Sequence, residues 1–376
     1  MVTVASALVV GGGPAGLSAA IALRQADVDR VQVVELTDGN GPIGSELSIA
    51  GPMLRALDAL GAADRCAADG VGIEQATFRN VAGEVTHTIP FPPPHRQGLP
   101  PTVGITRPRL HAILTERALS VGATLERGVS VDALDQRDRG VDVSLTDGTS
   151  DSYDLVVGAD GVASRLRSYV SPLAPRPEFV GQAAWRARVP RDGLEPMLTV
   201  LNGPSSKSGL ITVSAEYAYV FCLVTVPRFE RIVREDFPQR LREQLAEFGG
   251  PIARLRDAIV NPDHIHYSPL TPLIVDPPWH RGRVLLIGDA VHATTPHLAY
   301  GAGLAVEDGL VLGDTIAHHD DLDAALVAFT ERRYERCRMV VANGVQLSHW
   351  EQRPDDPAAD FMGLSVRSFT ALAEPI

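Results

Sequence analysis

The stretch Ala7-Leu-Val-Val-Gly-Gly-Gly-Pro-Ala-Gly16 decides the fold, because an apolar strand runs directly into a glycine turn and then into an Ala/Leu-rich helical segment. Gly11, Gly13 and Gly16 have the GxGxxG spacing. In that motif the first glycine makes the tight turn, the second lets backbone approach a phosphate, and the third lets helix pack on strand. The start of the helix would then offer N–H groups and its positive dipole end to a pyrophosphate. The motif predicts a dinucleotide site; the alternative is a purely structural glycine turn.

Two acidic residues stand at the ends of further apolar strands. Val31-Gln-Val-Val-Glu35 ends in Glu35, where a carboxylate can accept hydrogen bonds from ribose hydroxyls. Far downstream, Arg283-Val-Leu-Leu-Ile287 runs into the corner Gly288-Asp289, and Asp289 could accept hydrogen bonds from a polyol chain. The alternative for Asp289 is an N-cap on a structural helix. Together the two ends of the chain indicate one long cofactor held at both ends, which favours FAD over NAD.

A third motif is Asp154-Leu-Val-Val-Gly-Ala-Asp-Gly-Val-Ala-Ser-Arg-Leu-Arg167. Asp160 and Gly161 come just after its apolar strand, where a glycine permits close backbone approach and a carboxylate can organise a loop. An ordinary strand-to-loop corner would look the same.

Length, charge and cysteine content narrow the class of protein. The 376 residues exceed the usual size of one domain, so we expect two interleaved domains. A net charge of −12 argues against nucleic acid and anionic membranes as partners, because both bind a basic face. Three widely spaced cysteines indicate reduced thiols in a cytoplasmic protein, without disulfides or a metal site. We also expect no signal peptide and no membrane span.

The pattern of apolar residues predicts an α/β fold. Continuous apolar runs at 5–10, 31–35, 154–158 and 283–287 are typical of buried parallel strands, whereas alternation at 198–201 and 217–226 is typical of an antiparallel sheet with one covered face. We therefore expect a Rossmann-like FAD-binding domain, a parallel sheet with helices, interleaved with a smaller antiparallel-sheet substrate domain. The former would comprise 1–75, 100–175 and 270–376 with the C-terminal helices, and the latter 76–99 and 176–269. Helices are expected over 52–67, 107–119 and 234–247.

The three motifs, in this order and spacing, resemble those of the single-component FAD-dependent aromatic hydroxylases, the p-hydroxybenzoate hydroxylase-like flavoprotein monooxygenases. The resemblance covers nearly the whole chain. It implies that Gly11, Gly13, Pro14, Ala15 and Gly16 face the FAD pyrophosphate and that Glu35 binds the adenosine ribose.

The resemblance also implies the other contacts of the cofactor. Arg107 would lie near the ribityl-phosphate, Asp160 would support FAD and help with NAD(P)H, and Asp289 would bind the ribityl chain or pyrophosphate. Pro296 would lie beside the isoalloxazine ring. The backbone at Gly301, Ala302 and Gly303 would face the pyrimidine edge of the flavin, at the start of a helix. No metal is implied.

The chain departs from the family pattern beside the flavin. The family has Gly-Gln-Gly after the proline, whereas this chain has Ala299-Tyr300-Gly301, and Gly303 stands where an asparagine or cysteine is common. Backbone contacts to FAD should survive these changes. Tyr300 could line the substrate pocket or point away as packing.

Candidate substrate contacts come from the antiparallel region. Trp185 and Arg186 lie on the strand that resembles the family strand leading into the pocket, and Arg186 could pair with a substrate anion or within the sheet. Lys207 is the only lysine and, by similarity to the urate hydroxylase branch, falls where a pocket arginine would sit. With Tyr219 it could deprotonate or orient a phenol. The alternative is a solvated loop lysine and a packing tyrosine.

In this family NADH or NADPH reduces the flavin, dioxygen adds to form a C4a-hydroperoxyflavin, and the terminal oxygen goes to an electron-rich carbon. The resemblance therefore implies an NAD(P)H-dependent FAD monooxygenase that hydroxylates an aromatic or heteroaromatic small molecule, as a monomer or homodimer. A hydroxylase of a natural-product or antibiotic scaffold would use the same chemistry. Two rivals stay open: a non-oxygenating FAD reductase or dehydrogenase, and a flavoprotein partner or sensor without turnover.

Overall fold

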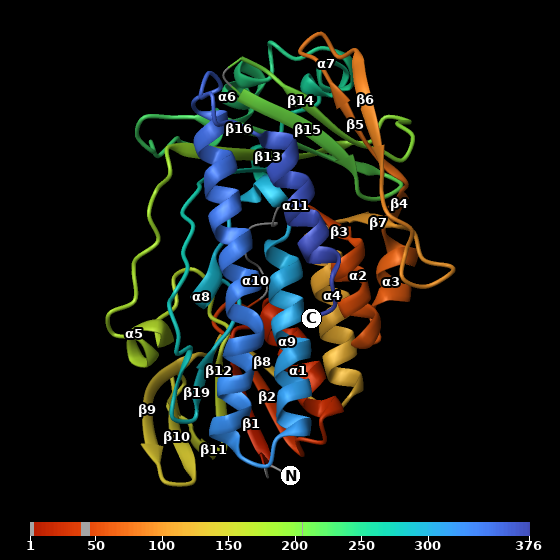
Figure 1. Ribbon diagram of the computed structural model, residues 1–376. Coiled ribbons are helices and arrows are strands. Elements are labelled where there is room, and N and C mark those ends of the chain that lie inside the picture. Colours follow the sequence, from red (N-terminus) through yellow and green to blue (C-terminus); the bar gives the residue numbers. More distant parts are fainter. Residues whose placement is uncertain (1–3, 39–45, 205) are drawn as a thin grey trace.

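The computed structural model describes residues 4–38, 46–204 and 206–376. The protein has two halves, and each is built around one large β-sheet (Figure 1). The lower half in this view contains a six-stranded sheet with the order β18-β19-β12-β1-β2-β8, parallel except at the edge strand β18. Its strands are β1 (Ser6–Val10), β2 (Arg30–Glu35), β8 (Thr124–Arg127), β12 (Leu155–Gly158), β18 (His280–Arg281) and β19 (Val284–Leu286). The predicted parallel sheet of an α/β fold is therefore confirmed.

Two helices far apart in the sequence pack closely in this half. Helix α1 (Pro14–Gln25) lies along α9 (Gly301–His318), which in turn packs on the long α10 (Leu322–Glu351). Glycines permit the approach: a Cβ at Gly309 would lie 2.4 Å from the backbone carbon of Ser18, and one at Gly313 would lie 2.7 Å from Cβ of Ala22. This pairing makes α1 and α9 parallel, so their N-termini open at the same end of the helix pair.

The remaining elements of the lower half surround this core. The prediction of one helix over 52–67 was wrong, because Gly61 takes a φ of +76° between two shorter helices, α2 and α3. Two three-stranded sheets complete the half: β3-β7-β4, and β11-β10-β9, which contacts β1 and β12. The bounds are α2 (Gly51–Ala59), α3 (Ala63–Asp69), α4 (Arg107–Ser120), α5 (Leu166–Val170), α8 (Asp289–His292), α11 (Phe361–Ala373), β3 (Leu47–Ala50), β4 (Val71–Ile73), β7 (Thr102–Ile105), β9 (Val131–Arg137), β10 (Gly140–Leu145) and β11 (Ser150–Tyr153).

The upper half is a seven-stranded sheet, here called the upper sheet, with the order β17-β13-β16-β15-β14-β5-β6. All of its neighbouring strands are antiparallel except β14 and β5. The antiparallel excursion predicted near residue 75 thus joins the predicted later sheet, although the domain limits themselves stay a prediction. The strands are β5 (Gln75–Arg79), β6 (Val85–Pro90), β13 (Gln182–Pro190), β14 (Leu198–Asn202), β15 (Ser206–Thr212), β16 (Tyr217–Thr225) and β17 (Ile265–Pro269).

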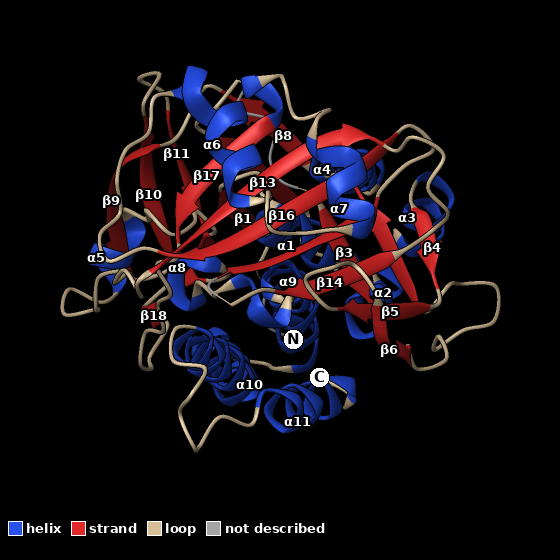
Figure 2. Cartoon of the chain, turned by 90° about the horizontal axis from the view of Figure 1, so that it is seen from above, coloured by secondary structure: helices blue, strands red, loops and turns tan. Residues whose placement is uncertain are grey.

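The two faces of the upper sheet have different environments. Helices α6 (Phe237–Gln244) and α7 (Gly250–Arg256) cover the outer face, as Figure 2 shows from above. Trp185 belongs to this outer core, where it stacks on Tyr267 with ring centroids 4.2 Å apart, so it does not lead into a pocket. Because side chains alternate along a strand, its neighbour Arg186 points to the opposite, inner face. Within the described ranges, no helix combines the length and apolar character that a bilayer crossing requires.

Candidate active site

The glycine turn between β1 and α1 has the geometry of a phosphate cradle. Gly11 takes a φ of +113°, and a Cβ there would lie 2.3 Å from the carbonyl oxygen of Ala159. A Cβ at Gly16 would lie 1.9 Å from the carbonyl oxygen of Gly11, whereas one at Gly13 would meet nothing within 4 Å. Gly13 is the N-cap of α1, and within the described ranges no side chain caps this helix. The space beside Gly13 therefore lies next to the free backbone N–H groups at the N-terminus of α1, which can bind an anion.

Glu35 is fixed beside this turn as an acceptor. Its Oε2 accepts a hydrogen bond from the backbone N–H of Gly12 at 2.7 Å, and its Oε1 accepts two from Thr37, at 2.9 Å from the backbone N–H and 2.7 Å from the hydroxyl. Burial alone would raise the pKa of Glu35, but the hydrogen bonds from Thr37 and Gly12 lower it. The carboxylate is thus ionised and partly exposed at the end of β2, where the sequence predicted a ribose contact.

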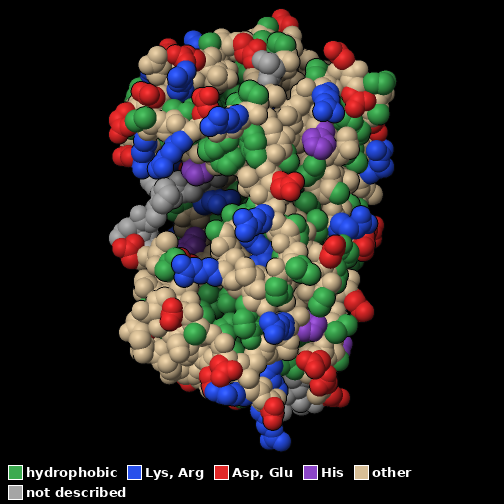
Figure 3. Space-filling view, turned by 90° about the vertical axis from the view of Figure 1, so that its left-hand side faces the viewer, with side chains coloured by type: hydrophobic (Ala, Val, Ile, Leu, Met, Phe, Trp, Pro, Cys, Tyr) green, Lys and Arg blue, Asp and Glu red, His purple; other side chains and the backbone are tan. Residues whose placement is uncertain are grey.

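Figure 3 shows a hollow between the two halves, with basic side chains and histidine inside it. Arg107 and Asp289 lie within electrostatic reach of each other, and Arg107 also lies within reach of Arg186 on the upper sheet. Each is the first residue of a helix, α4 or α8, and each side chain is exposed. Burial nevertheless raises the pKa of Asp289 and lowers that of Arg107, since protein surrounds both groups. Charged side chains that water can still reach, but that are surrounded by enough protein to shift their pKa values, are typical of the walls of a deep cleft. The two opposite charges also influence each other's pKa across it.

Asp160 organises the loop after β12, as predicted. Its Oδ2 accepts hydrogen bonds from the backbone N–H groups of Arg165 at 2.9 Å and Leu166 at 3.3 Å, while its buried Oδ1 has no partner among the residues that the structure describes. Arg167 ties this loop to α8 by donating to the carbonyl oxygens of Ala290 at 3.0 Å and Val162 at 2.8 Å. The orphaned Oδ1 leaves an acceptor next to the cradle.

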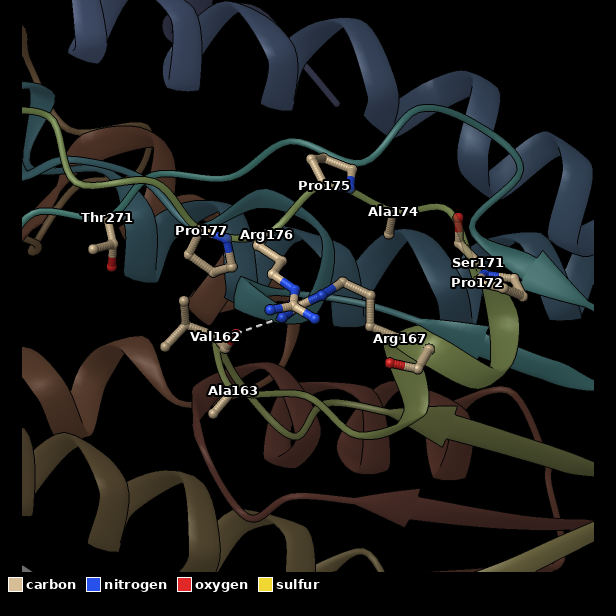
Figure 4. Close-up of a pocket in the computed structure, with 11 residues that line it drawn as sticks. Val162, Ala163, Arg167, Ser171, Pro172, Ala174, Pro175, Arg176, Pro177 and Thr271 are labelled. Atoms are coloured by element: carbon tan, nitrogen blue, oxygen red, sulfur yellow. Dashed lines mark hydrogen bonds between the residues drawn. The ribbon is translucent and has the colours of Figure 1, made fainter.

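A separate pocket of about 560 Å³ lies beside this loop (Figure 4). Arg167 and Arg176 both point into it, and three prolines, Pro172, Pro175 and Pro177, form part of its wall. Neither Arg107 nor Asp289 is among its lining residues.

The start of α9 explains the chain's departures from the family pattern. Ala299 takes the left-handed conformation, with a φ of +49°, at the position where the family has glycine. Tyr300 is 2% exposed and donates a hydrogen bond from its hydroxyl to Glu307 at 2.6 Å, so it packs inward and does not line the cleft. A Cβ at Gly303 would lie 2.7 Å from the Tyr300 ring. The two departures are therefore coupled, because the inward tyrosine leaves room only for glycine at 303.

A buried ionic network beneath this segment was not predicted from the sequence. Arg333 donates to Asp308 at 2.7 Å and to Glu307 at 2.9 Å, and all three side chains are fully buried. Asp308 also accepts hydrogen bonds from the backbone N–H of Gly288 at 2.8 Å and from His292 at 2.6 Å. The network thus holds the corner that presents Asp289.

The charges of this network stabilise one another. Burial alone would raise the pKa of Asp308, but His292 and Arg333 lower it to about 2. Burial alone would lower the pKa of His292, but Asp308 raises it well above its usual range. His292, Asp308 and Cys337 are close enough together to suggest a metal site, yet Arg333 already supplies the cation that neutralises Asp308. We therefore interpret the cluster as structural.

Lys207 lies in a second charged cluster, away from Tyr219. It forms an ion pair with Glu351 at the end of α10, and the other oxygen of Glu351 accepts from His297 Nε2 at 3.0 Å. The side chain of His297 is fully buried, whereas the preceding residue, Pro296, is partly exposed. The strand register sets Lys207 opposite Leu223, four residues from Tyr219 on β16. The structure therefore does not form the predicted Lys207–Tyr219 pair, because about 13 Å of strand separates the two positions.

Tyr219 instead lies with Arg186 on the inner face of the upper sheet. Arg186 donates to Ser268 Oγ at 3.0 Å, and its charge lowers the pKa of Tyr219, although burial raises that pKa more. Tyr219 and Phe221 form a tilted aromatic pair with centroids 6.2 Å apart. This face offers aromatic surface beside cationic groups.

These features fit an FAD molecule. The cradle at Gly13 and the N-terminus of α1 would hold the pyrophosphate, Glu35 the ribose, and Asp289 with Arg107 the middle of the cofactor. The parallel start of α9 would present the backbone N–H groups of residues 301–303 to the flavin. The fold and the site together define a flavoprotein with its substrate space under an antiparallel sheet.

Comparisons with known proteins agree with this class. Residues 4–343 match the family model for an FAD binding domain. The FAD-dependent urate hydroxylase of Klebsiella pneumoniae is 31% identical over 347 residues, covering 89% of this chain and 87% of that protein. The 2-heptyl-3-hydroxy-4(1H)-quinolone synthase of Pseudomonas aeruginosa is 33% identical over 314 residues, covering 81% and 79%. Klebsiella pneumoniae HpxO, in a crystal structure complexed with FAD and uric acid, has a TM-score of 0.83 at 27% identity over 98% of this chain and 92% of that chain.

The chain belongs to the family of FAD-dependent aromatic hydroxylase-like monooxygenases. Its cofactor is FAD, and NAD(P)H is the co-substrate that this family uses.

Proposed function

We propose that this monooxygenase hydroxylates an aromatic or heteroaromatic small molecule held between the cofactor cleft and the inner face of the upper sheet. The observation that carries this proposal is the arrangement of that face: Tyr219, Phe221 and Ile211 provide an apolar wall, and Arg186 stands next to it. A flat ring packs well against such a wall, while a cation at its edge fixes the orientation. The relatives named above act on urate or are named for a quinolone, which supports a planar substrate.

Bound FAD, reduced by NAD(P)H, supplies the oxygen chemistry. The residues of the chain position the ring, exclude water and hold charge. We propose that Arg186 and Tyr219 orient the substrate, and that Pro296 and the N-terminus of α9 form the wall toward the flavin. The ammonium group of Lys207 is already paired with Glu351. In this proposal Lys207 therefore acts indirectly, by positioning Glu351 and, through it, His297. We further propose a cytoplasmic location, which the three free, buried cysteines support.

The test is NAD(P)H oxidation with oxygen uptake by the purified holoenzyme, in the presence of phenols, hydroxybenzoates and N-heterocycles. A compound that accelerates oxidation and is recovered with one added oxygen supports the proposal. If compounds accelerate NAD(P)H oxidation without gaining oxygen, the non-oxygenating alternative holds.

A further inference from the structure

We propose that the substrate carries a planar anionic group, a ring carboxylate or a ring oxyanion, and that Arg186 and Arg188 of β13 bind it. The inference rests on the proposed function for its location and adds the charge of the substrate, with Arg188 as a second binding residue.

The two guanidinium groups come from alternate residues of one strand and therefore from the same face. Their Cα atoms are about 6.6 Å apart along β13. The strand register sets Arg186 opposite Phe221 and Arg188 opposite Tyr219, so both arginines flank the aromatic wall. Two forks at this spacing can hold the oxygens of one planar anion.

Neither arginine has an acidic partner. Among the described residues, no carboxylate lies within 4.0 Å of either guanidinium group, whereas Lys207 is paired with Glu351, and Arg333 with Glu307 and Asp308. Arg186 donates a hydrogen bond to the Ser268 hydroxyl at 3.0 Å and lies beside the hydroxyl of Tyr219, and both of these groups are uncharged. Arg188 lies over the ring of Tyr217, 5.0 Å from its centroid, and its buried Nε has no hydrogen-bond partner in the part of the chain that the structure describes. A buried donor without an acceptor is costly unless a ligand satisfies it.

The other ionisable groups near the two arginines do not pair with their positive charges. Glu46 is a carboxyl group within electrostatic reach of Arg188, but it forms no ion pair with that arginine, and burial raises its pKa. His264 and His266 have pKa values lowered by burial and by the arginines, which keeps them neutral at pH 7.

The third arginine of the cleft, Arg107, belongs to the lower half with Asp289 and has a predicted partner in FAD. The uncompensated charge on β13 is notable in a chain with a net charge of −12. Since a concave wall of one sign concentrates ligands of the opposite sign, the geometry selects an anion.

The experiment measures binding to the FAD-loaded enzyme from the change in flavin absorbance. The probes are matched pairs that differ in charge: hydroxybenzoates against the corresponding hydroxybenzamides, and acidic N-heterocycles against their neutral N-methylated analogues. The first set reports a carboxylate and the second a ring oxyanion. We expect an anion of at least one set to bind about tenfold or more tighter than its neutral partner, the effect of one charge-assisted hydrogen bond.

Arg186→Gln and Arg188→Gln, singly and together, should remove this preference and its salt dependence while the FAD content stays at the wild-type level. Arg254→Gln is the matched control, because Arg254 is an exposed arginine of the same half, paired with Asp192. It should leave the preference unchanged. Loss of FAD in the β13 variants would assign these arginines to the cofactor and overturn the inference.

Equal binding of both members of every pair, or failure of every anion to bind, would also overturn it. The outcome separates this inference from the proposed function. If the double variant hydroxylates a neutral compound at the wild-type rate, the monooxygenase function is supported and the anion site is contradicted. If anions bind selectively but never stimulate NAD(P)H oxidation, the anion site is supported and the monooxygenase function is contradicted.

Discussion

Replacing Glu351 by glutamine should destabilise the protein strongly, because its carboxylate neutralises Lys207 and accepts from His297 in a partly closed space. The Glu351 side chain is 14% exposed and that of Lys207 is 21% exposed. Burial alone would raise the pKa of Glu351, but Lys207 and His297 lower it to about 2 from 4.5. At 1.36 kcal/mol per pKa unit, this difference corresponds to about 3 kcal/mol of stability at pH 7. Glutamine keeps the shape and a hydrogen bond, so we expect a loss of about 2–3 kcal/mol.

The pH dependence of this effect has a definite sign. Because the folded-state pKa of Glu351 lies below its ordinary value of 4.5, its stabilising effect is complete well above pH 4.5 and fades as the pH falls toward about 2. The difference between wild type and Glu351→Gln should therefore shrink to roughly 1 kcal/mol at pH 3.

Urea unfolding of the FAD-loaded proteins, followed by circular dichroism at several pH values, measures this difference. Lys207→Met alone, and combined with Glu351→Gln, completes a double-mutant cycle with an expected coupling of about 2 kcal/mol. A coupling below about 0.5 kcal/mol would refute the reasoning and return Lys207 to the status of a free pocket cation.

Three further substitutions test other parts of the site. Gly13→Val should abolish FAD binding, measured as flavin content, while the apoprotein still folds, since a Cβ there meets no protein atom; a variant with full flavin would contradict the assignment of the cradle. Tyr300→Phe should lower stability in urea unfolding by about 1–2 kcal/mol, because it removes a buried hydrogen bond to the carboxylate of Glu307, whose Oε1 keeps its hydrogen bond from Arg336, with kcat unchanged; a selective loss of kcat would place Tyr300 at the substrate. Ala299→Gly should raise the free energy of unfolding, measured by thermal denaturation, by roughly 0.5–1 kcal/mol, because glycine adopts the left-handed conformation of residue 299 without the strain of an alanine. A decrease would show that this strain is absent.

The cofactor cleft was largely predictable because its signals are local. A glycine turn, an acid at a strand end and a Gly-Asp corner are each defined by a few neighbouring residues, and the order of strands in an α/β sheet brings them together. The structure gives the glycine turn the expected local geometry, with an open position at Gly13, and it places Glu35 at the end of β2 and Asp289 at the start of α8. The contacts of these residues with FAD stay a prediction.

The clusters around the cleft were less predictable, because long-range packing creates them. Lys207 and Glu351 are 144 residues apart, and no periodicity links a strand lysine to the end of the last long helix. The inward turn of Tyr300 similarly depends on Glu307 and on the arginines of α10. A signal for Arg188 did exist: it follows Arg186 by two residues on a predicted strand, and alternation alone would have placed both on one face.

The most direct test of the central claim is the fate of dioxygen. The FAD-loaded enzyme is given NAD(P)H and a stimulating aromatic compound under ¹⁸O-labelled dioxygen, and the product is analysed by mass spectrometry against a parallel reaction in ¹⁸O-labelled water. We predict a product that contains one oxygen atom from dioxygen, formed in a one-to-one ratio with the NAD(P)H consumed. A product without label from dioxygen, with all of the consumed oxygen recovered as hydrogen peroxide, would contradict the assignment as a monooxygenase.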